Sequence, residues 1–234
     1  MRILAVGAHP DDLEILCAGT LARYARDGHE VMMAHVTRGD KGSYHEQPAE
    51  MARARAAEAR AAGAVIGAVV IALNLGDGEL FTEDRETRDI FVDLIRAARP
   101  DVILTHAPDD YMADHNAVSK LVFDASFIAT LPHYPSRSRY HEQVTPLYYM
   151  DTLAGVGFLP TEYVDISDVI EQKRAMLRSH ASQLVWLREH DGIDVVEFME
   201  TMGRFRGLQC GVHFAEGFTQ AQAWLRQRPV RLLP

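Results

Sequence analysis

The ten residues AVGAHPDDLE at positions 5–14 decide the fold class and raise a question about function. Small and apolar residues run directly into the polar stretch His-Pro-Asp-Asp at 9–12, so a strand that looks buried ends on polar side chains. One interpretation is a helix cap, because proline fits the first helical turn and aspartates accept hydrogen bonds from its free N–H groups. A cap does not account for His9. The alternative is a metal site whose remaining ligand lies elsewhere in the chain.

Length and composition predict one globular domain over residues 1–234. Hydrophobic residues make up 47% of the chain and charged residues 24%, a balance that allows a sizeable core. The formal net charge of −9 argues against a nucleic-acid-binding protein, which would need a basic surface. The negative net charge does not exclude a local basic pocket that binds a small anion.

The cysteines and the N-terminus predict a cytoplasmic protein. Cys17 and Cys210 lie far apart and form no CxxC pair, so we expect reduced thiols. The N-terminal apolar run is short and stops at charged residues, which is not typical of a secretion signal. No stretch approaches the length of a membrane span. We therefore expect a soluble, intracellular chain.

The first half of the chain alternates apolar and amphipathic segments. Four apolar runs, rich in Val, Ile and Leu, are typical of buried strands: 2–8, 29–37, 68–75 and 101–107. The segments between them have helical patterns: one from Leu13 to about Asp27, then 49–63 and 85–99. This alternation predicts right-handed βαβ units and a parallel sheet.

The second half continues with both kinds of element. We expect a helix from about 115 to 130, strands at 146–151 and 162–167, a helix capped by Ser167 that includes His180, and a helix at 194–208. The prediction for the whole chain is an α/β fold, a Rossmann-like, doubly wound and mostly parallel sheet with helices on both faces.

The turn after the first strand lacks the glycine pattern GxGxxG and a Lys-Ser/Thr pair, so it does not indicate dinucleotide or P-loop binding. Open α/β sheets still bind ligands beyond the carboxyl ends of their strands, where the first and fourth strands are neighbours. His9 and Asp12 follow the first strand and His115 follows the fourth. Two histidines and one carboxylate with an open position describe a catalytic zinc or iron(II) site. Asp11 could be the base that activates water.

Spacing alone supports the metal site and the cap equally, because the chain contains 11 histidines. AHPDDLE resembles the corresponding motif of the LmbE-like, or PIG-L, deacetylase family. Further matching segments include TRGDKG (37–42), RPDVILTH (99–106), DH (114–115) and HASQ (180–183). The resemblance covers most of the chain. It implies a metal-dependent deacetylase whose partner is a small amino-sugar substrate of the N-acetylglucosamine type, free or conjugated.

The same resemblance implies roles for individual residues. His9, Asp12 and His115 would hold Zn²⁺, with Fe²⁺ as the other option, and Asp11 would be the general base. Arg55, in an R-x-x-E pattern, would contact the substrate.

Arg55 and Asp77 are the two candidate substrate-binding residues, and each also has a simpler interpretation. Arg55 lies among other arginines and alanines, so a solvated helix face is its alternative. Asp77, in the sequence GDG, is either a turn residue or an acceptor for a sugar hydroxyl.

One position departs from the family pattern. Members commonly carry H-P-D-H where this chain has Met-Ala-Asp-His at 112–115. Met112 can neither donate a proton nor stabilise an oxyanion by hydrogen bonding. We favour Asp11 as the group that both takes and returns the proton, and expect Asp114 to support the metal ligands. Other candidates for the missing histidine's role are Asp110, Tyr111, His45 and His213.

Two other functions stay open at this point. One is a metal-dependent hydrolase of another amide or of an ester, and the other is a non-catalytic protein that binds metal and a sugar-like ligand. Met112 is compatible with a binding protein, whereas Asp11 argues against it, since a pure binder needs no base. The resemblance also leaves open a homo-oligomer, because relatives often form trimers or hexamers.

Overall fold

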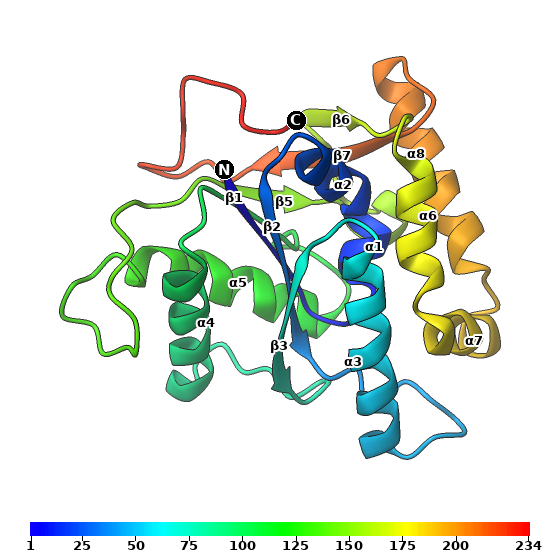
Figure 1. Cartoon of the computed structure of the whole chain (residues 1–234), viewed down its shortest axis with the longest axis horizontal. Helices are drawn as coiled ribbons and strands as arrows, with labels where there is room; N and C mark the ends of the chain where they lie inside the picture. Colours follow the sequence, from blue (N-terminus) through cyan, green and yellow to red (C-terminus); the bar gives the residue numbers. More distant parts are fainter.

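The computed structural model describes residues 1–234 as a central sheet between two layers of helices (Figure 1). The strands are β1 (Arg2–Gly7), β2 (Glu30–Thr37), β3 (Val69–Leu75), β4 (Val102–Thr105), β5 (Leu147–Met150), β6 (Glu162–Asp165) and β7 (Ala215–Gln220). The helices are α1 (Asp12–Leu16), α2 (Ala18–Arg26), α3 (Pro48–Ala64), α4 (Arg85–Ala98), α5 (Ala113–Ile128), α6 (Ile170–Arg178), α7 (Ala181–His190) and α8 (Val195–Cys210), with a short 3₁₀ turn, η1 (Leu153–Gly155).

The seven strands follow the order β3-β2-β1-β4-β5-β7-β6. The first five are parallel to one another, while β7 runs antiparallel to both of its neighbours, β5 and β6. The strand order reverses between β1 and β4, which pair directly. The predicted doubly wound, mostly parallel sheet is confirmed, and its switch point lies where the sequence placed it.

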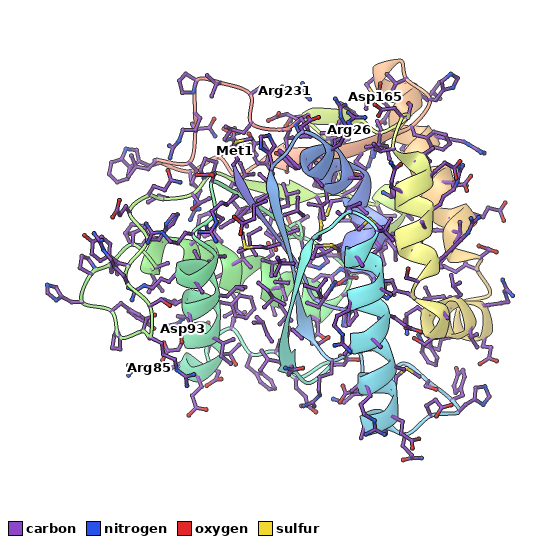
Figure 2. The ribbon with its side chains drawn as sticks, in the orientation of Figure 1. Met1, Arg26, Arg85, Asp93, Asp165 and Arg231 are labelled. Carbon is purple, nitrogen blue, oxygen red and sulfur yellow. The ribbon has the colours of Figure 1, made fainter.

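Each face of the sheet covers a separate core, which explains why the strands are apolar without alternation. On β1, Ile3 and Ala5 pack with α1, α2, α6 and α8, while Leu4 and Val6 pack with α4 and α5. Charged side chains such as Arg26 and Arg85 lie at the periphery of these layers (Figure 2). None of the helices combines the length and the apolar character needed to cross a membrane.

The helix predicted from Leu13 is two helices, because the backbone breaks at Cys17 (φ −143°, ψ 7°) between α1 and α2. Asp11 occupies the position before α1 but its side chain makes no capping hydrogen bond. The helix-cap interpretation of Asp11 is therefore wrong. Its carboxylate turns toward the interior.

Two further predictions differ from the structure in the second half, and one strand there was not predicted. The helix expected to include His180 is interrupted there, and His180 lies between α6 and α7. Ser167 does not cap it; its hydroxyl donates to Asp165 instead (2.6 Å), and α6 begins at Ile170. The strand β7 was not anticipated. It pairs with strands far away in sequence, and short-range patterns do not report such pairings.

Candidate metal centre

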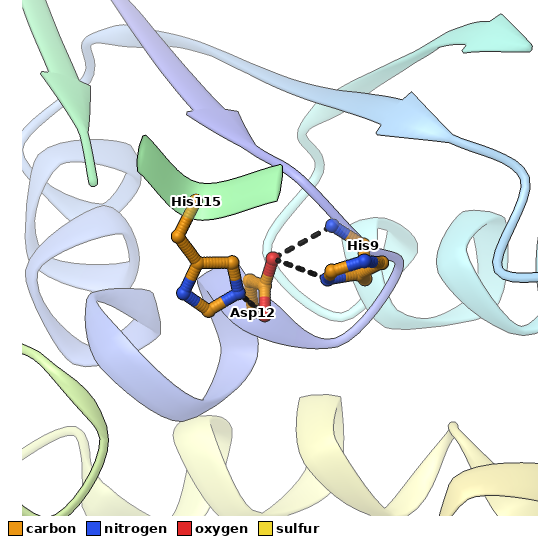
Figure 3. A group of neighbouring side chains, drawn as sticks. All are labelled: His9, Asp12 and His115. Carbon is orange, nitrogen blue, oxygen red and sulfur yellow. Dashed lines mark hydrogen bonds and ion pairs between the residues drawn. The ribbon is translucent and has the colours of Figure 1, made fainter. Parts of the chain in front are cut away.

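The three predicted metal ligands meet at the carboxyl ends of β1 and β4 (Figure 3). His9 lies in the turn after β1 and Asp12 begins α1, while His115 lies in the first turn of α5, the helix that follows β4. Because β1 and β4 are paired, these two turns come together. The potential ligand atoms of the three side chains all lie within 4.8 Å of one another.

The spacing of Asp12 from each histidine is compatible with a tetrahedral metal site. Asp12 Oδ1 lies 3.3 Å from His115 Nε2, and Asp12 Oδ2 lies 3.5 Å from His9 Nδ1. Ligand atoms about 2.1 Å from a tetrahedral Zn²⁺ are about 3.4 Å from one another. The Nε2 atom of His115 is buried and has no hydrogen-bond partner. A divalent cation would satisfy it, so these residues fit the metal.

Each histidine of the cluster has its other ring nitrogen on a carboxylate. His115 Nδ1 lies 3.0 Å from Asp110 Oδ2, and His9 Nε2 lies 3.1 Å from Asp114 Oδ2. Such contacts fix the ring orientation and strengthen the nitrogen that faces the metal. Asp114 thus contacts the ring of His9, one of the predicted ligands. Asp110 contacts the ring of His115 in the same way. Its carboxylate therefore does not face a substrate, whereas the histidine that the family commonly carries at position 112 would.

The electrostatics of the cluster favour positive charge. Burial lowers the pKa of His9, but hydrogen bonds to Asp114 and Asp12 outweigh it and raise the pKa to about 10. Burial likewise lowers the pKa of His115, and the Asp12 charge and Asp110 raise it to about 9. For Asp12, burial opposes ionisation, but His115 and His106 hold the pKa well below its usual range. The same field would stabilise a metal cation.

His106 belongs to this centre and was missed by sequence reasoning. It is fully buried directly after β4, and its ring stacks on that of His115 with centroids 3.9 Å apart. Its Nε2 accepts a hydrogen bond from the Ala8 N–H (2.9 Å), so this nitrogen is not free to bind metal. Burial lowers the pKa of His106 to about 4, which keeps the ring neutral. The sequence contained a signal for this residue, because His106 follows the apolar run of β4 just as His9 follows the apolar run of β1.

Asp11 lies next to the cluster in an unusual backbone conformation. Its φ is +129°, a region that costs about 1–3 kcal/mol for residues other than glycine. Arg55 holds it there, donating to Asp11 Oδ1 (3.1 Å) and to the Pro10 carbonyl oxygen. Burial raises the pKa of the Asp11 carboxyl to about 6 and the Arg55 charge opposes this rise.

The predicted substrate residues are occupied by the protein itself. Arg55 is buried and also donates to the Gly39 carbonyl oxygen (3.3 Å), so its contacts are those of a group that positions Asp11. Gly39 has φ +65°, and a Cβ there would collide with the guanidinium. Asp77 accepts from the backbone N–H groups of Gly39 (2.8 Å) and Lys41 (3.1 Å). Arg55 and Asp77 nevertheless line the cavity that opens over the cluster.

A cavity of about 750 Å³ opens over the cluster. His9, Asp11 and Asp12 line it together with Met112 and Tyr111. This volume is within the range of about 300–1,000 Å³ that holds a small organic ligand.

The remaining candidates for the role of the missing histidine do not lie in this cavity. His45 is exposed and lies 3.0 Å from Glu189. His213 is not among the cavity residues either. Of the four candidates outside Asp11, Tyr111 is the one that lines the cavity.

Comparison with known proteins gives four findings. The sequence model of the GlcNAc-PI de-N-acetylase family, PIG-L, matches residues 4–126. The chain is similar to the diacetylchitobiose deacetylase of Thermococcus kodakarensis, with 31% identity over 92% of this chain and 81% of that one. It is also similar to a 4-oxalmesaconate hydratase of Pseudomonas putida, with 26% identity over 77% of this chain and 73% of that one. Among solved structures, N,N'-diacetylchitobiose deacetylase from Pyrococcus horikoshii superposes with a TM-score of 0.82 and 26% identity, covering 94% of this chain and 83% of that one.

Proposed function

Because the chain belongs to the PIG-L family of GlcNAc-PI de-N-acetylases, we propose that it hydrolyses the N-acetyl group of an N-acetylglucosamine-type sugar or conjugate. The products are acetate and a free amine. Zinc is the proposed metal, and iron(II) suits the same ligands.

The observation that carries this proposal is the position of Asp11. Its carboxylate shares one cavity with His9 and Asp12, and Arg55 holds its Oδ1 atom at 3.1 Å. A protein that only bound metal would gain nothing from a buried, strained carboxylate beside the ligands. A hydrolase needs a base at this place.

The chemistry divides between the metal and the side chains. His9, Asp12 and His115 would hold the zinc ion, which when bound would supply a Lewis acid for the acetyl carbonyl and lower the pKa of the attacking water. Asp11 accepts the proton of that water on a carboxylate oxygen as the oxygen–carbon bond forms. Asp11 then gives the proton to the amide nitrogen. The C–N bond breaks in this step, and the electron pair of that bond stays with the departing amine. Met112 takes no part in this cycle.

Arg55 and the orienting carboxylates act on other residues and not on the substrate. Arg55 keeps Asp11 in place and its charge favours the ionised form that the first step needs. Asp110 and Asp114 fix the rings of His115 and His9. The three positioning residues thus prepare the base and the ligands before substrate arrives.

Hydration is the second candidate, because a hydratase is among the relatives. Hydration also needs an activated water and a base. The 4-oxalmesaconate named for that relative is an anion and would need free cationic side chains. In this cavity Lys41 lies 2.6 Å from Glu79, and Arg55 is held by Asp11. Because both cationic side chains are already paired with carboxylates, the cavity favours a neutral amino sugar over an anionic substrate.

The first experiment measures acetate release by zinc-loaded protein from a panel of N-acetylglucosamine derivatives, with chelated protein as the control. Acetate release that needs metal supports the proposal. Hydrolysis of other amides or esters alone would assign a different hydrolase, and water addition to an unsaturated carboxylate would assign the hydratase. Bound metal and bound sugar with no product would identify a binding protein.

A further inference from the structure

The cavity over the metal centre is also lined by apolar side chains that have no role in the proposed reaction. We call it the apolar wall, and it consists of Leu153, Val156, Trp186, Leu187, Ile193 and Phe198. These residues come from η1 and the residue after it, from α7 and the turn after α7, and from α8. They line the same cavity as His9, Asp11 and Asp12, so a substrate whose acetamide reaches the metal extends beside them.

The aliphatic members of the apolar wall, Leu153, Val156, Leu187 and Ile193, do not suit the hydroxyl groups of a bare sugar. Each sugar hydroxyl that leaves water needs a hydrogen-bond partner, and aliphatic side chains offer none. An apolar substituent gains by leaving water for the same surface. Val156 is 74% exposed in this structure, and Tyr111 at the cavity edge is 77% exposed. Large apolar side chains left exposed beside a catalytic centre indicate a binding surface.

Aromatic rings hold one side of this surface in place. The rings of Trp186 and His190 stack with centroids 4.4 Å apart, and Tyr44 lies 4.9 Å from Trp186. Trp186 also packs against Gly42, where an added Cβ would lie 3.4 Å from Nε1. The segment containing Gly42 and Tyr44 is tied to α7 again by His45 and Glu189. The wall is therefore supported from two separate parts of the chain.

We propose that the substrate is an amino sugar carrying an apolar group, alkyl or aryl, that rests against the apolar wall. This inference rests on the deacetylase function proposed above and adds the substrate class. The apolar group is either the aglycone of the sugar or an extended N-acyl chain, since both share the chemistry that the wall selects. The volume of about 750 Å³ accommodates such a group together with the sugar ring.

Three substrates that differ by one apolar group test the proposal. They are the methyl glycoside of N-acetylglucosamine, its hexyl glycoside, and the methyl glycoside of N-hexanoylglucosamine. Release of free amine by zinc-loaded protein gives kcat/KM for each. We expect one hexyl-bearing substrate to exceed the methyl reference by about tenfold or more. A preference for the hexyl glycoside would assign the apolar group to the aglycone. A preference for the N-hexanoyl compound would assign it to the acyl chain. A ratio below about twofold for both would overturn the proposal.

Variants connect any preference to the apolar wall. Trp186→Ala removes the ring that faces the cavity, and Val156→Ser changes an exposed side chain with little risk to folding. Both are expected to lower the hexyl-to-methyl ratio. Val185→Ala is the matched control, because Val185 is the exposed neighbour on α7 and does not line the cavity. An unchanged ratio in Val156→Ser and Trp186→Ala would contradict the assignment of the wall.

Binding separates this inference from the proposed reaction. Calorimetry measures the affinity of zinc-loaded protein for the hexyl and methyl glycosides of glucosamine, which carry no acetyl group. Preference for the hexyl compound without amine release from any substrate would refute the deacetylase function but support the apolar wall. Amine release without any hexyl preference in rate or binding would support the function and overturn this inference.

Discussion

At the scale of single residues, the candidate centre depends on carboxylates that differ in surroundings and so in task. Asp12 contacts three histidine rings, Asp110 and Asp114 each face one histidine ring, and Asp11 is held by Arg55. The first arrangement suits a ligand, the second an orienting group, and the third a base. Identical side chains are thus suited to separate roles because of what they contact.

Asp11→Asn tests the base. The amide keeps the shape of the side chain but cannot accept the proton of the attacking water, so turnover should fall by about 100-fold or more. Zinc content, measured by atomic absorption, should stay at the wild-type value because Asp11 is not a proposed ligand. Asp109→Asn, at an exposed position, is the control. Wild-type turnover in Asp11→Asn would refute the assignment.

Asp110→Ala tests the orientation of His115. Loss of the 3.0 Å contact to Nδ1 frees the ring, so zinc affinity should fall by about 10–100-fold. Competition with a fluorescent chelator measures the affinity. Asp109→Ala should bind zinc as the wild type does. Equal affinities of the two variants would show that Asp110 has no role in holding the ligand.

At the scale of elements, one buried carboxylate links β7 to the helices that cover the sheet. Glu216 on β7 accepts from the N–H groups of Gly19 (2.8 Å) and Thr20 (2.7 Å) at the start of α2, and from Lys173 on α6. All of these groups are buried away from the cavity over the metal centre. The contact joins α2, α6 and β7, three elements far apart in sequence.

Lys173→Met should therefore destabilise the whole protein. The substitution leaves Glu216 charged and buried without its cation, which typically costs about 3–5 kcal/mol of unfolding free energy. Urea unfolding measures the change. Lys120→Met, which removes an exposed lysine paired with Asp124, should cost less than about 1 kcal/mol. A similar small cost for Lys173→Met would contradict the structural role.

A second junction, between α1 and the residue that precedes α7, should make stability depend on pH. His180 Nε2 lies 3.2 Å from Glu14 Oε1, and both side chains are fully buried. Burial lowers the pKa of His180, but the Glu14 charge outweighs it and raises the pKa above 6.5. Burial raises the pKa of Glu14, but His180 outweighs it and lowers the pKa below 4.5.

The sign of the effect follows from these directions. The raised pKa of His180 contributes stability that is full below pH 6.5 and is lost as pH rises through its folded pKa. The lowered pKa of Glu14 contributes stability above pH 4.5 that is lost as pH falls. The stability of metal-free wild type relative to His180→Gln should be greatest between pH 4.5 and 6.5 and should shrink at alkaline pH. Urea unfolding across pH measures it, and a difference independent of pH would contradict the charged pair.

At the scale of the whole molecule, the proposed metal connects the two halves of the parallel sheet. His9 and Asp12 follow β1, which leads into the β1-β2-β3 half, and His115 follows β4 on the other side of the switch point. A cation held by all three would cross-link turns separated by about a hundred residues of chain.

Metal removal should lower the thermal stability of the protein. A ligand that binds only the folded state stabilises it by about 2.7 kcal/mol at a hundred times its Kd. Calorimetry with and without a chelator should therefore show a lower Tm for the chelated protein. His115→Ala lacks one ligand, so its Tm should respond much less to zinc. An equal response in both proteins would place the metal elsewhere.

The sequence by itself determined the parallel part of the sheet and the place of the candidate site. Apolar runs and helical patterns are short-range signals, and a switch point follows from their alternation, so His9, Asp12 and His115 could be brought together on paper. The tertiary structure decided what depends on long-range packing: the insertion of β7 between β5 and β6, the tasks of Asp110 and His106, and the engagement of Arg55 with Asp11. Side-chain direction and the pairing of distant strands are set by contacts between segments far apart in the chain, and no local pattern encodes them.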